Sequence, residues 1–442
     1  MICKNPEDVK KLVKDRNVSF IQFWFVDVLG ILKSFAITPS ELEEGLSEGM
    51  GFDGSSIQGF ARIEESDMIA KPDPTTLQFI PWRAGDRPSV RMFCDILNPD
   101  GTPYEGDPRY VLKRMLKRAA DMGYTFYAGP ELEYFYFESN EAPKIIDRAG
   151  YFDTRPLDKG VDLRRETIFA LQDMGIQIEY SHHEVAPSQH EIDMRYDEGL
   201  RMADKTITLR TVVKEVARQH GYYATFMPKP IFGENGSGMH THQSLFKGKT
   251  NAFFDAKDQY HLSKIAKNYI AGILKHSREI TAVLNQWVNS YKRLVPGYEA
   301  PVYISWARRN RSALVRVPMY KPGKEKATRI EFRSPDPACN PYLAFAVMLA
   351  AGLKGIEENY PLPDPIEEDI YELSPEKRRK LKIQELPGNL YEAISEVEKS
   401  KLVRDALGDH IFSKFIENKK IEWDRYRIHV TEYEIEKYLP IM

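Results

Sequence analysis

The feature that most constrains the fold is an aromatic run, residues 125–138, that carries two glutamates in its middle. Aromatic residues favour β-structure, so the run predicts a strand. Glu131 and Glu133 are two residues apart, so their side chains point to the same face of that strand. Neighbouring carboxylates repel each other, and a buried face of this kind requires a metal ion or a basic partner. The alternative is a solvent-facing strand, where the pair would be harmless.

Three more glutamates lie in segments that also predict strands. Residues 176–193 read as two strands joined by a Pro-Ser turn, with Glu184 ending the first and Glu191 beginning the second. A hairpin would bring these two carboxylates near each other. Residues 328–337 alternate in polarity, which places Glu331 on one face with two arginines.

A glycine-rich stretch, residues 233–244, follows a segment in which Pro228 and Pro230 favour extended chain. Its glycines allow the backbone to approach a ligand closely. From His240 onward the residues alternate, so His240, His242 and Ser244 share one strand face, which suits a metal–phosphate site. The alternative is a polar turn before an ordinary strand. The glycine spacing matches neither familiar phosphate-binding loop.

These residues together favour phosphoryl transfer. Carboxylates with one imidazole suit Mg²⁺ or Mn²⁺ better than structural zinc. Arginine binds carboxylate and phosphate in a bidentate manner. Five arginines lie in the strand-like segments and in the loop at residues 291–301: Arg293, Arg311, Arg316, Arg329 and Arg333. Metals held by carboxylates beside an arginine cluster predict transfer of a phosphoryl group from a nucleotide. A solvated barrel rim is the alternative interpretation.

Composition excludes several classes. The chain has 442 residues, 42% of them hydrophobic, which allows a large core. Its net charge of −3, without a basic stripe, argues against nucleic acid. Scattered cysteines, Cys3, Cys94 and Cys339, predict a reducing compartment without disulfides. The N-terminus lacks an apolar export segment, and the apolar run 342–353 is too short to span a bilayer. We therefore expect a cytoplasmic protein with no membrane partner.

A turn cluster at residues 98–103 predicts a domain boundary. Before it, helix 6–16 and strands 20–27 and 31–37 form a small α+β unit. Asp53 lies in a Gly- and Ser-rich loop of this unit that could hold one carboxylate in a defined place, although a surface turn is the alternative.

Beyond the boundary, helices are expected at 107–121, 196–219, 261–285 and 341–357. Two prolines and a glycine make residues 291–301 an irregular loop that carries Arg293 and Glu299. Residues 308–316 are strand-like and rich in arginine.

Five motifs in this chain resemble those of glutamine synthetase of the prokaryotic type I class. They are Phe-Asp-Gly-Ser-Ser (52–56), Gly-Pro-Glu-Leu-Glu-Tyr-Phe (129–135), Asn-Gly-Ser-Gly-Met-His-Thr-His (235–242), Arg-Leu-Val-Pro-Gly-Tyr-Glu-Ala-Pro (293–301) and Arg-Ile-Glu-Phe-Arg-Ser-Pro-Asp-Pro (329–337). They occur in the family's order, and the resemblance covers nearly the whole chain. The length and residues 59–67 resemble the alpha subtype, which lacks an insertion of the beta subtype.

The resemblance implies an α+β fold of two domains. Residues 1–103 would form a β-grasp-like domain, and residues 104–442 a catalytic domain with a curved antiparallel sheet, a half-barrel funnel, flanked by helices. ATP would phosphorylate the γ-carboxylate of L-glutamate, and ammonia would then displace phosphate to give L-glutamine. The small domain would complete the active site of a neighbouring subunit in a dodecamer of two stacked hexamers.

The resemblance also implies residue roles. Glu133, Glu184 and Glu191 would hold a metal beside glutamate, and Glu131, His240 and Glu331 a metal beside ATP, with two or three Mg²⁺ or Mn²⁺ ions per site. Glutamate would be bound by Asn235, Gly236, Arg293, Glu299, Arg311 and Arg333. ATP would be bound by Glu179, Thr241, His242, Gln243, Ser244, Arg311, Arg316 and Lys326.

Four of the implied roles concern catalysis or regulation. Asp53 would attract ammonium and take its proton, and Arg311 would steady phosphate oxygens. Glu299 would close over the site and exclude water. Arg62 matches an alpha-subtype position linked to feedback inhibition by glutamine. Activation by 2-oxoglutarate and PII-like or other regulatory protein partners are compatible with the resemblance, but the sequence does not identify them.

Two competing functions follow from the same motifs. A relative could join glutamate to a larger amine, but the intact loop around Asp53 disfavours it because an ammonium pocket needs that carboxylate. A catalytically silent homologue is the other alternative, and the filled metal-ligand positions disfavour it.

Tyr371 lies near the site that beta-type enzymes adenylylate, but residues 374–379 depart from that pattern, so we expect no modification there.

Overall fold

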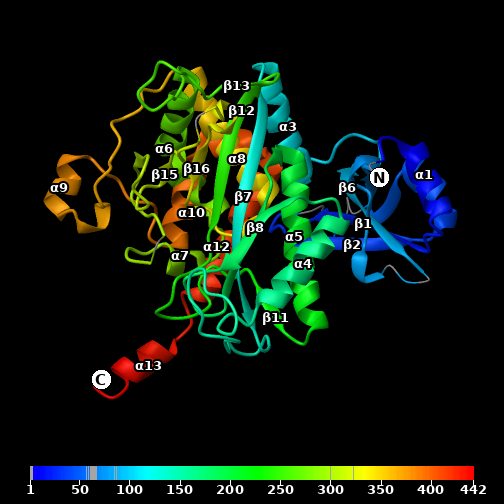
Figure 1. Cartoon of the computed structure of the whole chain (residues 1–442), viewed down its shortest axis with the longest axis horizontal. Helices are drawn as coiled ribbons and strands as arrows, with labels where there is room; N and C mark the ends of the chain where they lie inside the picture. The colour runs from blue at the N-terminus through cyan, green and yellow to red at the C-terminus, as the bar shows by residue number, and fades with distance from the viewer. Residues whose placement is uncertain are drawn as a thin grey trace.

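The computed structural model describes residues 3–55, 57, 59, 67–83, 85, 87–298, 300–321 and 323–442. Two sheets organise these residues: a six-stranded sheet near the N-terminus and a ten-stranded sheet in the rest of the chain. Figure 1 shows the small N-terminal domain lying beside the larger one. The α+β class and the β-grasp and half-barrel architecture expected from the sequence are confirmed.

The small domain is a mixed sheet with strand order β2-β1-β6-β4-β3, and β5 pairs with β6. β1 runs parallel to β6 and antiparallel to β2, as the hairpin prediction required. Its strands are β1 (Phe20–Val26), β2 (Leu32–Ile37), β3 (Met50–Asp53), β4 (Asp67–Pro72), β5 (Gln78–Phe79) and β6 (Ser89–Leu97). Its α-helices are α1 (Pro6–Asp15) and α2 (Leu42–Ser47). Apolar side chains of the strands and both helices form a core of their own.

The large sheet follows the order β14-β15-β16-β12-β7-β9-β8, and neighbours from β15 to β8 run antiparallel. β7 is the longest strand and also pairs with β10 and β11. The strands are β7 (Thr125–Phe137), β8 (Ile178–His183), β9 (Gln189–Met194), β10 (Asp197–Glu198), β11 (Tyr223–Thr225), β12 (Met239–Lys247), β13 (Thr250–Asn251), β14 (Trp306–Ala307), β15 (Val315–Arg316) and β16 (Ile330–Phe332).

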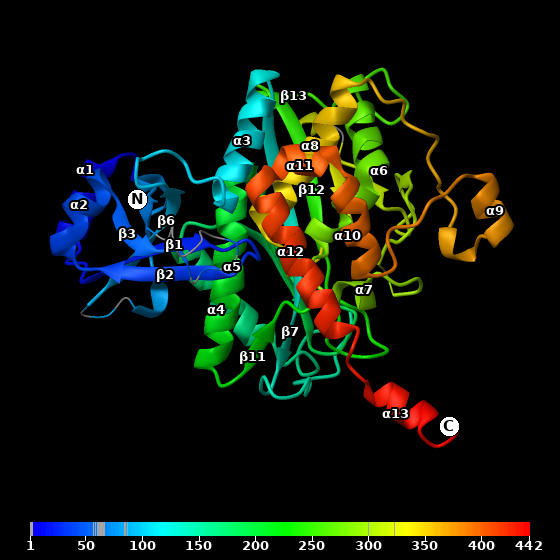
Figure 2. The ribbon, with the colours of Figure 1, turned by 180° about the vertical axis from the view of Figure 1, so that it is seen from behind.

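Helices cover the back of this sheet, as Figure 2 shows for α8, α11 and α12. The helices of the large domain are α3 (Pro108–Asp121), α4 (Val161–Asp173), α5 (Gly199–Gln219), α6 (Lys264–Leu284), α7 (Ser290–Arg293), α8 (Pro341–Glu357), α9 (Pro375–Lys380), α10 (Leu390–Lys399), α11 (Lys401–Leu407), α12 (Asp409–Tyr426) and α13 (Glu432–Tyr438). Figure 1 shows α13 projecting from the body at the C-terminus.

α8 is the central helix of the large domain. It begins where Asn340 caps the backbone N–H groups of Tyr342 and Leu343, with Pro341 in its first turn. It is apolar on every side and buried over almost its whole length, because α6, α3, α5 and α11 surround it. Within the described residues, every helix is too short or too polar to cross a membrane.

Two local predictions were wrong. Residues 291–293 are helical within α7 rather than irregular, because the first proline of that segment, Pro296, comes after the helix has ended. Residues 308–314 are turns rather than strand, and only Val315 and Arg316 of that segment join the sheet. The backbone N–H groups of Arg308 and Arg309 are bonded instead by the Glu367 carboxylate, a long-range contact that sequence pattern does not reveal.

The two domains meet at the turn between β1 and β2. Four successive carbonyls of this turn accept hydrogen bonds from side chains of the large domain. The bonds are Asn340 Nδ2 to Asp27 O (3.1 Å) and Val28 O (3.2 Å), Gln286 Nε2 to Leu29 O (2.8 Å), and Arg210 Nη2 to Gly30 O (2.9 Å). Buried carbonyls left without donors would be costly, so these contacts fix the turn.

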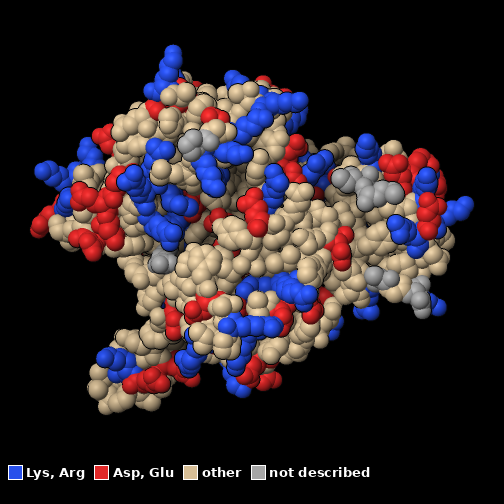
Figure 3. Space-filling model, in the orientation of Figure 1, with Lys and Arg blue, Asp and Glu red and all other residues tan. Residues whose placement is uncertain are grey.

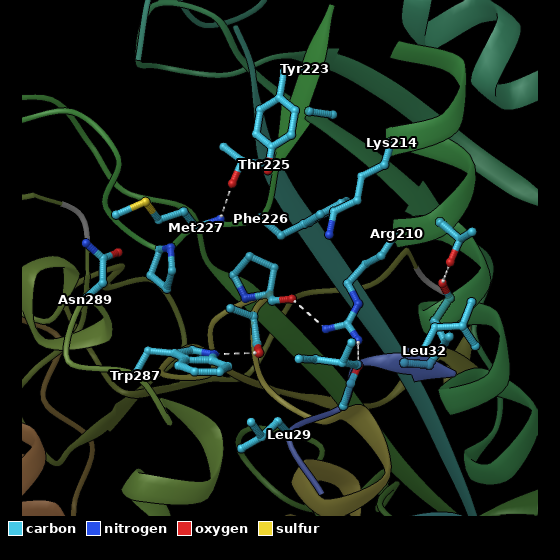
Figure 4. A pocket seen from close by; sticks show the side chains of 18 of the residues that line it. Leu29, Leu32, Arg210, Lys214, Tyr223, Thr225, Phe226, Met227, Trp287 and Asn289 are labelled. Atoms are coloured by element: carbon cyan, nitrogen blue, oxygen red, sulfur yellow. Dashed lines mark hydrogen bonds between the residues drawn. The ribbon is translucent and has the colours of Figure 1, made fainter. Parts of the chain in front are cut away.

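A cavity of about 850 Å³ lies beside this junction and is shown in Figure 4. Arg210 reaches across it to the Pro337 carbonyl (3.1 Å), and the Trp287 indole N–H donates to the Ala338 carbonyl (3.0 Å). The described residues that line this cavity include none of the catalytic or ligand-binding residues expected from the sequence. It is therefore a feature of the domain junction rather than of the site described below.

We expect Gly30→Ala to loosen the junction. Gly30 has a φ of +78°, and an added Cβ would lie 2.7 Å from the backbone Cα of Asn340. The matched control is Gly101→Ala, because Gly101 has a φ of +82° but open space around its Cα. The control should lose about 1 kcal/mol from left-handed strain alone, and Gly30→Ala a further ~1–3 kcal/mol from the clash. Urea unfolding at equal protein concentration measures both, and equal losses would contradict the clash.

Candidate active site

The candidate ligands converge on one face of the ten-stranded sheet. Residues directly opposite each other on antiparallel strands point to the same face. The directly opposed pairs are His240–Glu131, Glu131–Asp193, Glu133–Glu191, His182–Glu191, His242–Glu331 and Arg316–Glu331. The alternation read from the sequence at residues 131–133 and 240–244 is therefore confirmed, and it places the ligands in adjacent rows.

The first cluster consists of Glu131, His240 and Glu331, which were expected to hold one metal. One ligand atom from each lies within 4.8 Å of the others. His240 Nδ1 is 3.7 Å from Glu131 Oε2 and 3.6 Å from Glu331 Oε1. Two carboxylates and an imidazole at this separation form a donor set that Mg²⁺ or Mn²⁺ accepts.

Basic groups surround this first cluster. His242 Nε2 lies 2.7 Å from Glu131 Oε1, and Arg333 Nε lies 3.3 Å from Glu331 Oε1. Arg316 forms an ion pair with the other oxygen of Glu331. Burial would raise the pKa of Glu131, but the two imidazoles outweigh it and hold its pKa well below the ordinary value. The pKa of Glu331 is lowered for the same reason, mainly by His242 and Arg333 acting against burial. Both carboxylates are therefore ionised at neutral pH.

The second cluster contains Glu184 and Glu191, as expected, with His182 as an unexpected third member. His182 Nε2 lies 2.7 Å from Glu184 Oε1 and 3.8 Å from Glu191 Oε1. Glu133 lies beside this group, directly opposite Glu191. The sequence offered a signal for His182: adjacent residues of a strand face opposite ways, so one of His182 and His183 had to point toward the glutamates.

Acidic neighbours dominate this second cluster. Burial and the nearby Glu184 carboxylate raise the pKa of Glu133 to about 8. Burial and the carboxylates of Asp193 and Glu133 raise the pKa of Glu191 well above its ordinary value. Burial and Glu131 raise the pKa of Asp193 to about 8. Such a group repels itself unless protons or a cation neutralise it, so its residues fit a divalent metal.

The residues expected to bind glutamate border the second cluster. Arg293 is buried, and its guanidinium donates to the carbonyls of Ser334 (2.8 Å) and Arg333 (3.2 Å). Gly236 and Gly238 pack against it so closely that a Cβ on Gly238 would lie 2.6 Å from Arg293 Nη2. The Arg333 guanidinium donates to the Arg311 carbonyl, and the Arg311 side chain is exposed. The structure thus places the glycine-rich loop around Gly236 and Gly238 next to Arg293, Arg311 and Arg333, as the prediction required.

A second cavity, of about 250 Å³, lies next to Glu131. Among the residues that line it are Glu179, His242, Ser244 and Lys326, all of which were expected to bind ATP. Thr241 and Gln243 face differently: the Gln243 side chain is bonded to Tyr269 and Met348 in the helical layer, and the Thr241 hydroxyl donates to the Met239 carbonyl. Their side chains therefore point away from the cavity, although Gln243 also borders it.

Aromatic walls of this cavity were missed by sequence reasoning. Tyr127, Tyr180 and Tyr196 line it, and the rings of Tyr127 and Tyr196 lie 5.9 Å apart. Aromatic faces can stack on a nucleobase. Tyr196 is half exposed, and its position shortly before α5 gave no signal of this role.

A further group of ionisable residues lies on the other face of the hairpin. Asp147, Asp158, His183 and His190 are all buried close together. Arg164 neutralises this group, because it donates to Asp158 Oδ2 (2.7 Å) and contacts His190 Nδ1 (2.7 Å). His183 bridges Asp147 Oδ1 (2.9 Å) and the Glu184 carbonyl (2.7 Å). With a guanidinium in its centre, the group supports the hairpin rather than holding a metal.

Asp53 lies apart from these clusters. Asp53 is exposed at the end of β3 in the small domain, which Figures 1 and 2 show beside the large sheet. Its carboxylate accepts a hydrogen bond from the Ser55 N–H (2.8 Å), and bonding to Ser55 lowers its pKa. Arg62 and Glu299 lie outside the described residues.

Figure 3 shows acidic and basic side chains interspersed on the face of Figure 1, with Lys and Arg gathered near β15 and β16. This gathering agrees with the arginines of residues 308–316. A local basic region of this kind beside carboxylate clusters suits a small polyanion better than a nucleic acid.

Known proteins resemble the chain over its whole length. The family model described as "Glutamine synthetase, beta-Grasp domain" matches residues 17–99, and "Glutamine synthetase, catalytic domain" matches residues 105–438. The chain is 52% identical to a glutamine synthetase of Mycobacterium tuberculosis over 444 residues, which covers 99% of this chain and 100% of that one. It is also 52% identical to that of Methanosarcina mazei, covering 100% of this chain and 99% of that one.

Solved structures agree with these matches. A GmaS–ADP complex superposes with a TM-score of 0.89 at 30% identity, covering 98% of this chain and 99% of the other. A Plasmodium falciparum glutamine synthetase gives a TM-score of 0.89 at 26% identity, covering 99% of both chains. With both domains matched, and with carboxylates, imidazoles and arginines gathered on one sheet face, the chain belongs to the glutamine synthetase family.

Proposed function

We propose that the sheet face described above is where this chain carries out glutamine synthesis. The activity itself, ligation of ammonia to glutamate, follows from family membership and from about half of all residues being identical to named glutamine synthetases. The observation that supports the location is the convergence of two carboxylate–imidazole clusters on neighbouring strands, with three arginines beside them.

Divalent metal would be held at both clusters. Glu131, His240 and Glu331 would hold one ion, and Glu133, Glu184 and Glu191 another, with His182 beside the second. We propose Mg²⁺ or Mn²⁺, because these ions prefer carboxylate oxygens. Ions bound there neutralise the charge that develops on a phosphoryl group in transfer. The raised pKa values of Glu133 and Glu191 support the second site, because carboxyl groups held so close together need a cation.

The nucleotide would occupy the cavity beside Glu131. Glu179, His242, Ser244 and Lys326 line this cavity, and Tyr196 offers a ring for the base. Gln243 and Thr241 would contribute through their backbone, because their side chains face the helices or the chain itself. The similar GmaS structure contains ADP, which supports a nucleotide site in this fold. Arg311 and Arg316 would contact phosphate oxygens.

Glutamate would lie between the second cluster and the arginines. Arg293 and Arg333 would pair with its carboxylates, and the backbone of Asn235 and Gly236 would hold its amino acid end. Glycine is required at position 236, where a Cβ would lie 2.3 Å from the Pro228 carbonyl. Glu299 would complete this region on the chain that follows Arg293.

Phosphorylation is chemically necessary because ammonia cannot displace an oxide leaving group from a carboxylate. The γ-carboxylate of glutamate attacks the γ-phosphorus of ATP, which gives γ-glutamyl phosphate and ADP. Ammonia then attacks the acyl carbon, and phosphate leaves. Asp53 would take the proton from ammonium; its lowered pKa keeps it ionised and attractive to that cation.

The subtype, the oligomeric state and the regulation of the enzyme are also proposals. We infer the type I alpha subtype, a dodecamer of two hexamers, and an Asp53 that acts in the active site of the neighbouring subunit. The exposure of Asp53 in a domain beside its own active-site face supports this arrangement. Free, buried cysteines fit a reducing compartment such as the cytoplasm. Arg62 would mediate feedback by glutamine.

The first test is an assay of phosphate release from ATP by the purified chain. We expect release to require glutamate and ammonium together, with glutamine formed in equal amount, because the acyl phosphate needs an amine acceptor. Replacing ammonium with methylamine or ethylamine should give little release. Release that is independent of ammonium, or faster with a larger amine, would contradict the proposal.

The second test concerns pH and metal. In the metal-free folded protein, the pKa of Glu133 is about 8, far above its value in an unfolded chain. The folded state therefore binds a proton that the unfolded state has lost, and this contribution to stability disappears as the pH rises toward that value. In EDTA, the urea midpoint should fall between about pH 6 and about pH 9, and Glu133→Gln should weaken this dependence. Added Mn²⁺ should restore the midpoint in the wild type. Identical pH profiles for the two proteins would exclude Glu133 as the source.

The third test asks whether Asp53 acts on a neighbouring subunit. Asp53→Ala and Glu131→Ala should each be nearly inactive alone, because one loses the ammonium-side carboxylate and the other a metal ligand. Subunits mixed by unfolding and reassembly should regain up to about a quarter of wild-type activity, since random mixing joins the two intact halves at about one site in four. Wild-type protein taken through the same treatment is the control. No recovery in the mixture would show that Asp53 and Glu131 act within one chain.

A further inference from the structure

Gln189 lies where three parts of the active site meet, and none of the roles described above involves it. It is the first residue of β9, directly after the turn that follows Glu184, and its side chain is 1% exposed. A buried carboxamide needs partners for its oxygen and for both N–H groups. Its partners identify what it holds in place.

The carboxamide joins a metal ligand to the glycine loop. Nε2 donates to Glu133 Oε2 (3.0 Å) and to the Gly236 carbonyl (3.1 Å), and Oε1 accepts from the Ala186 N–H (3.2 Å). The opposite orientation of the amide would set its oxygen against a carboxylate and a carbonyl, so the assignment is unambiguous. One side chain thus links β7, the 184–189 turn and the loop that precedes β12.

The backbone of Gln189 holds a second metal ligand. Its carbonyl accepts a hydrogen bond from the Glu184 N–H (2.8 Å), and its N–H donates to the Ala186 carbonyl (3.1 Å). Gly238, at the end of the glycine loop, donates its N–H to Glu133 Oε2 (3.1 Å). With two donors on Oε2, Glu133 keeps Oε1 available for a cation.

We propose that Gln189 is a positioning residue that couples cation binding at Glu133 and Glu184 to glutamate binding at the Asn235–Gly236 loop. The inference rests on the proposed roles of these two groups. A cation that fixes Glu133 also fixes the carboxamide, and the carboxamide fixes the Gly236 carbonyl. Because coupling between two sites is reciprocal, glutamate must tighten cation binding by the same factor as the cation tightens glutamate binding.

The test measures this coupling directly in the full-length protein. Mn²⁺ affinity is determined from the electron paramagnetic resonance signal of free Mn²⁺, with and without saturating glutamate and without ATP. Gln189→Met keeps the length of the side chain but removes both donors. We expect the factor by which glutamate tightens Mn²⁺ binding to fall about fivefold, within the range that single substitutions produce. Part of the coupling should remain, because glutamate and the cation also contact each other.

The matched control is Gln286→Met. Gln286 is equally buried, and its Nε2 also donates to two carbonyls, those of Leu29 and Ala338, but these belong to the domain junction. Its coupling factor should equal that of the wild type. If Gln189→Met does not fold, Gln189→Asn serves instead, because its shorter carboxamide cannot reach both Glu133 and Gly236.

Steady-state kinetics of the Gln189 variant provide a second measurement. The KM for glutamate should rise several-fold at limiting Mn²⁺ while the KM for ATP stays constant.

The outcomes separate the inference from the proposed function. A coupling factor in the folded Gln189 variant within twofold of the wild type overturns the inference, and so does an equal loss in the Gln286→Met control. A wild type that binds Mn²⁺ and glutamate without any coupling overturns the inference alone. A wild type that binds neither overturns the proposed site as well, and with it the role of Gln189.

Discussion

The structure depends on the repulsion between carboxylates that one curved sheet holds against each other. Glu133, Glu191 and Asp193 point to the same face of adjacent strands, and burial together with neighbouring charge raises the pKa of each. An isolated strand would relieve this repulsion by turning toward solvent. The long pairing of β7 with β12 and β9, backed by the largely apolar α8, prevents that, so the core holds the carboxylates in an arrangement that their own repulsion disfavours.

The two clusters differ in how the charge of their buried carboxylates is balanced. Around Glu131 and Glu331, imidazoles and guanidiniums keep the carboxylates ionised. Around Glu133 and Glu191, acidic neighbours favour protonation until a cation arrives. A cation entering the second cluster must therefore displace protons, whereas the first cluster is prepared in advance. This asymmetry arises because His242 on β12 acts on both Glu131 and Glu331 and Arg316 on β15 pairs with Glu331, whereas the carboxylates of the second cluster mainly face one another.

Sequence pattern predicted the features that depend on local periodicity. The face shared by Glu131 and Glu133, the hairpin that joins Glu184 to Glu191, and the helix that begins at Pro341 all follow from residue spacing and capping. Sequence pattern did not predict the features that depend on contacts between residues far apart in the chain. The Glu367 carboxylate holds residues 308–309 out of the sheet, which cannot be read from neighbouring residues. The position of His182 was within reach of the same pattern, because His182 is two residues before Glu184 and therefore shares its face.

The junction of the two domains also bears on how such chains can change over time. The large domain holds the turn at residues 27–30 by its carbonyl oxygens, and the buried Val28 side chain belongs to the core of the large domain. Substitution of the half-buried Leu29 leaves those oxygens in place, whereas Val28 must stay apolar and Gly30 has no room for any side chain. Variation at Leu29 is thus compatible with constant docking. Related chains could exchange their small domains and keep the same mutual orientation, provided that this glycine and its three polar partners are retained.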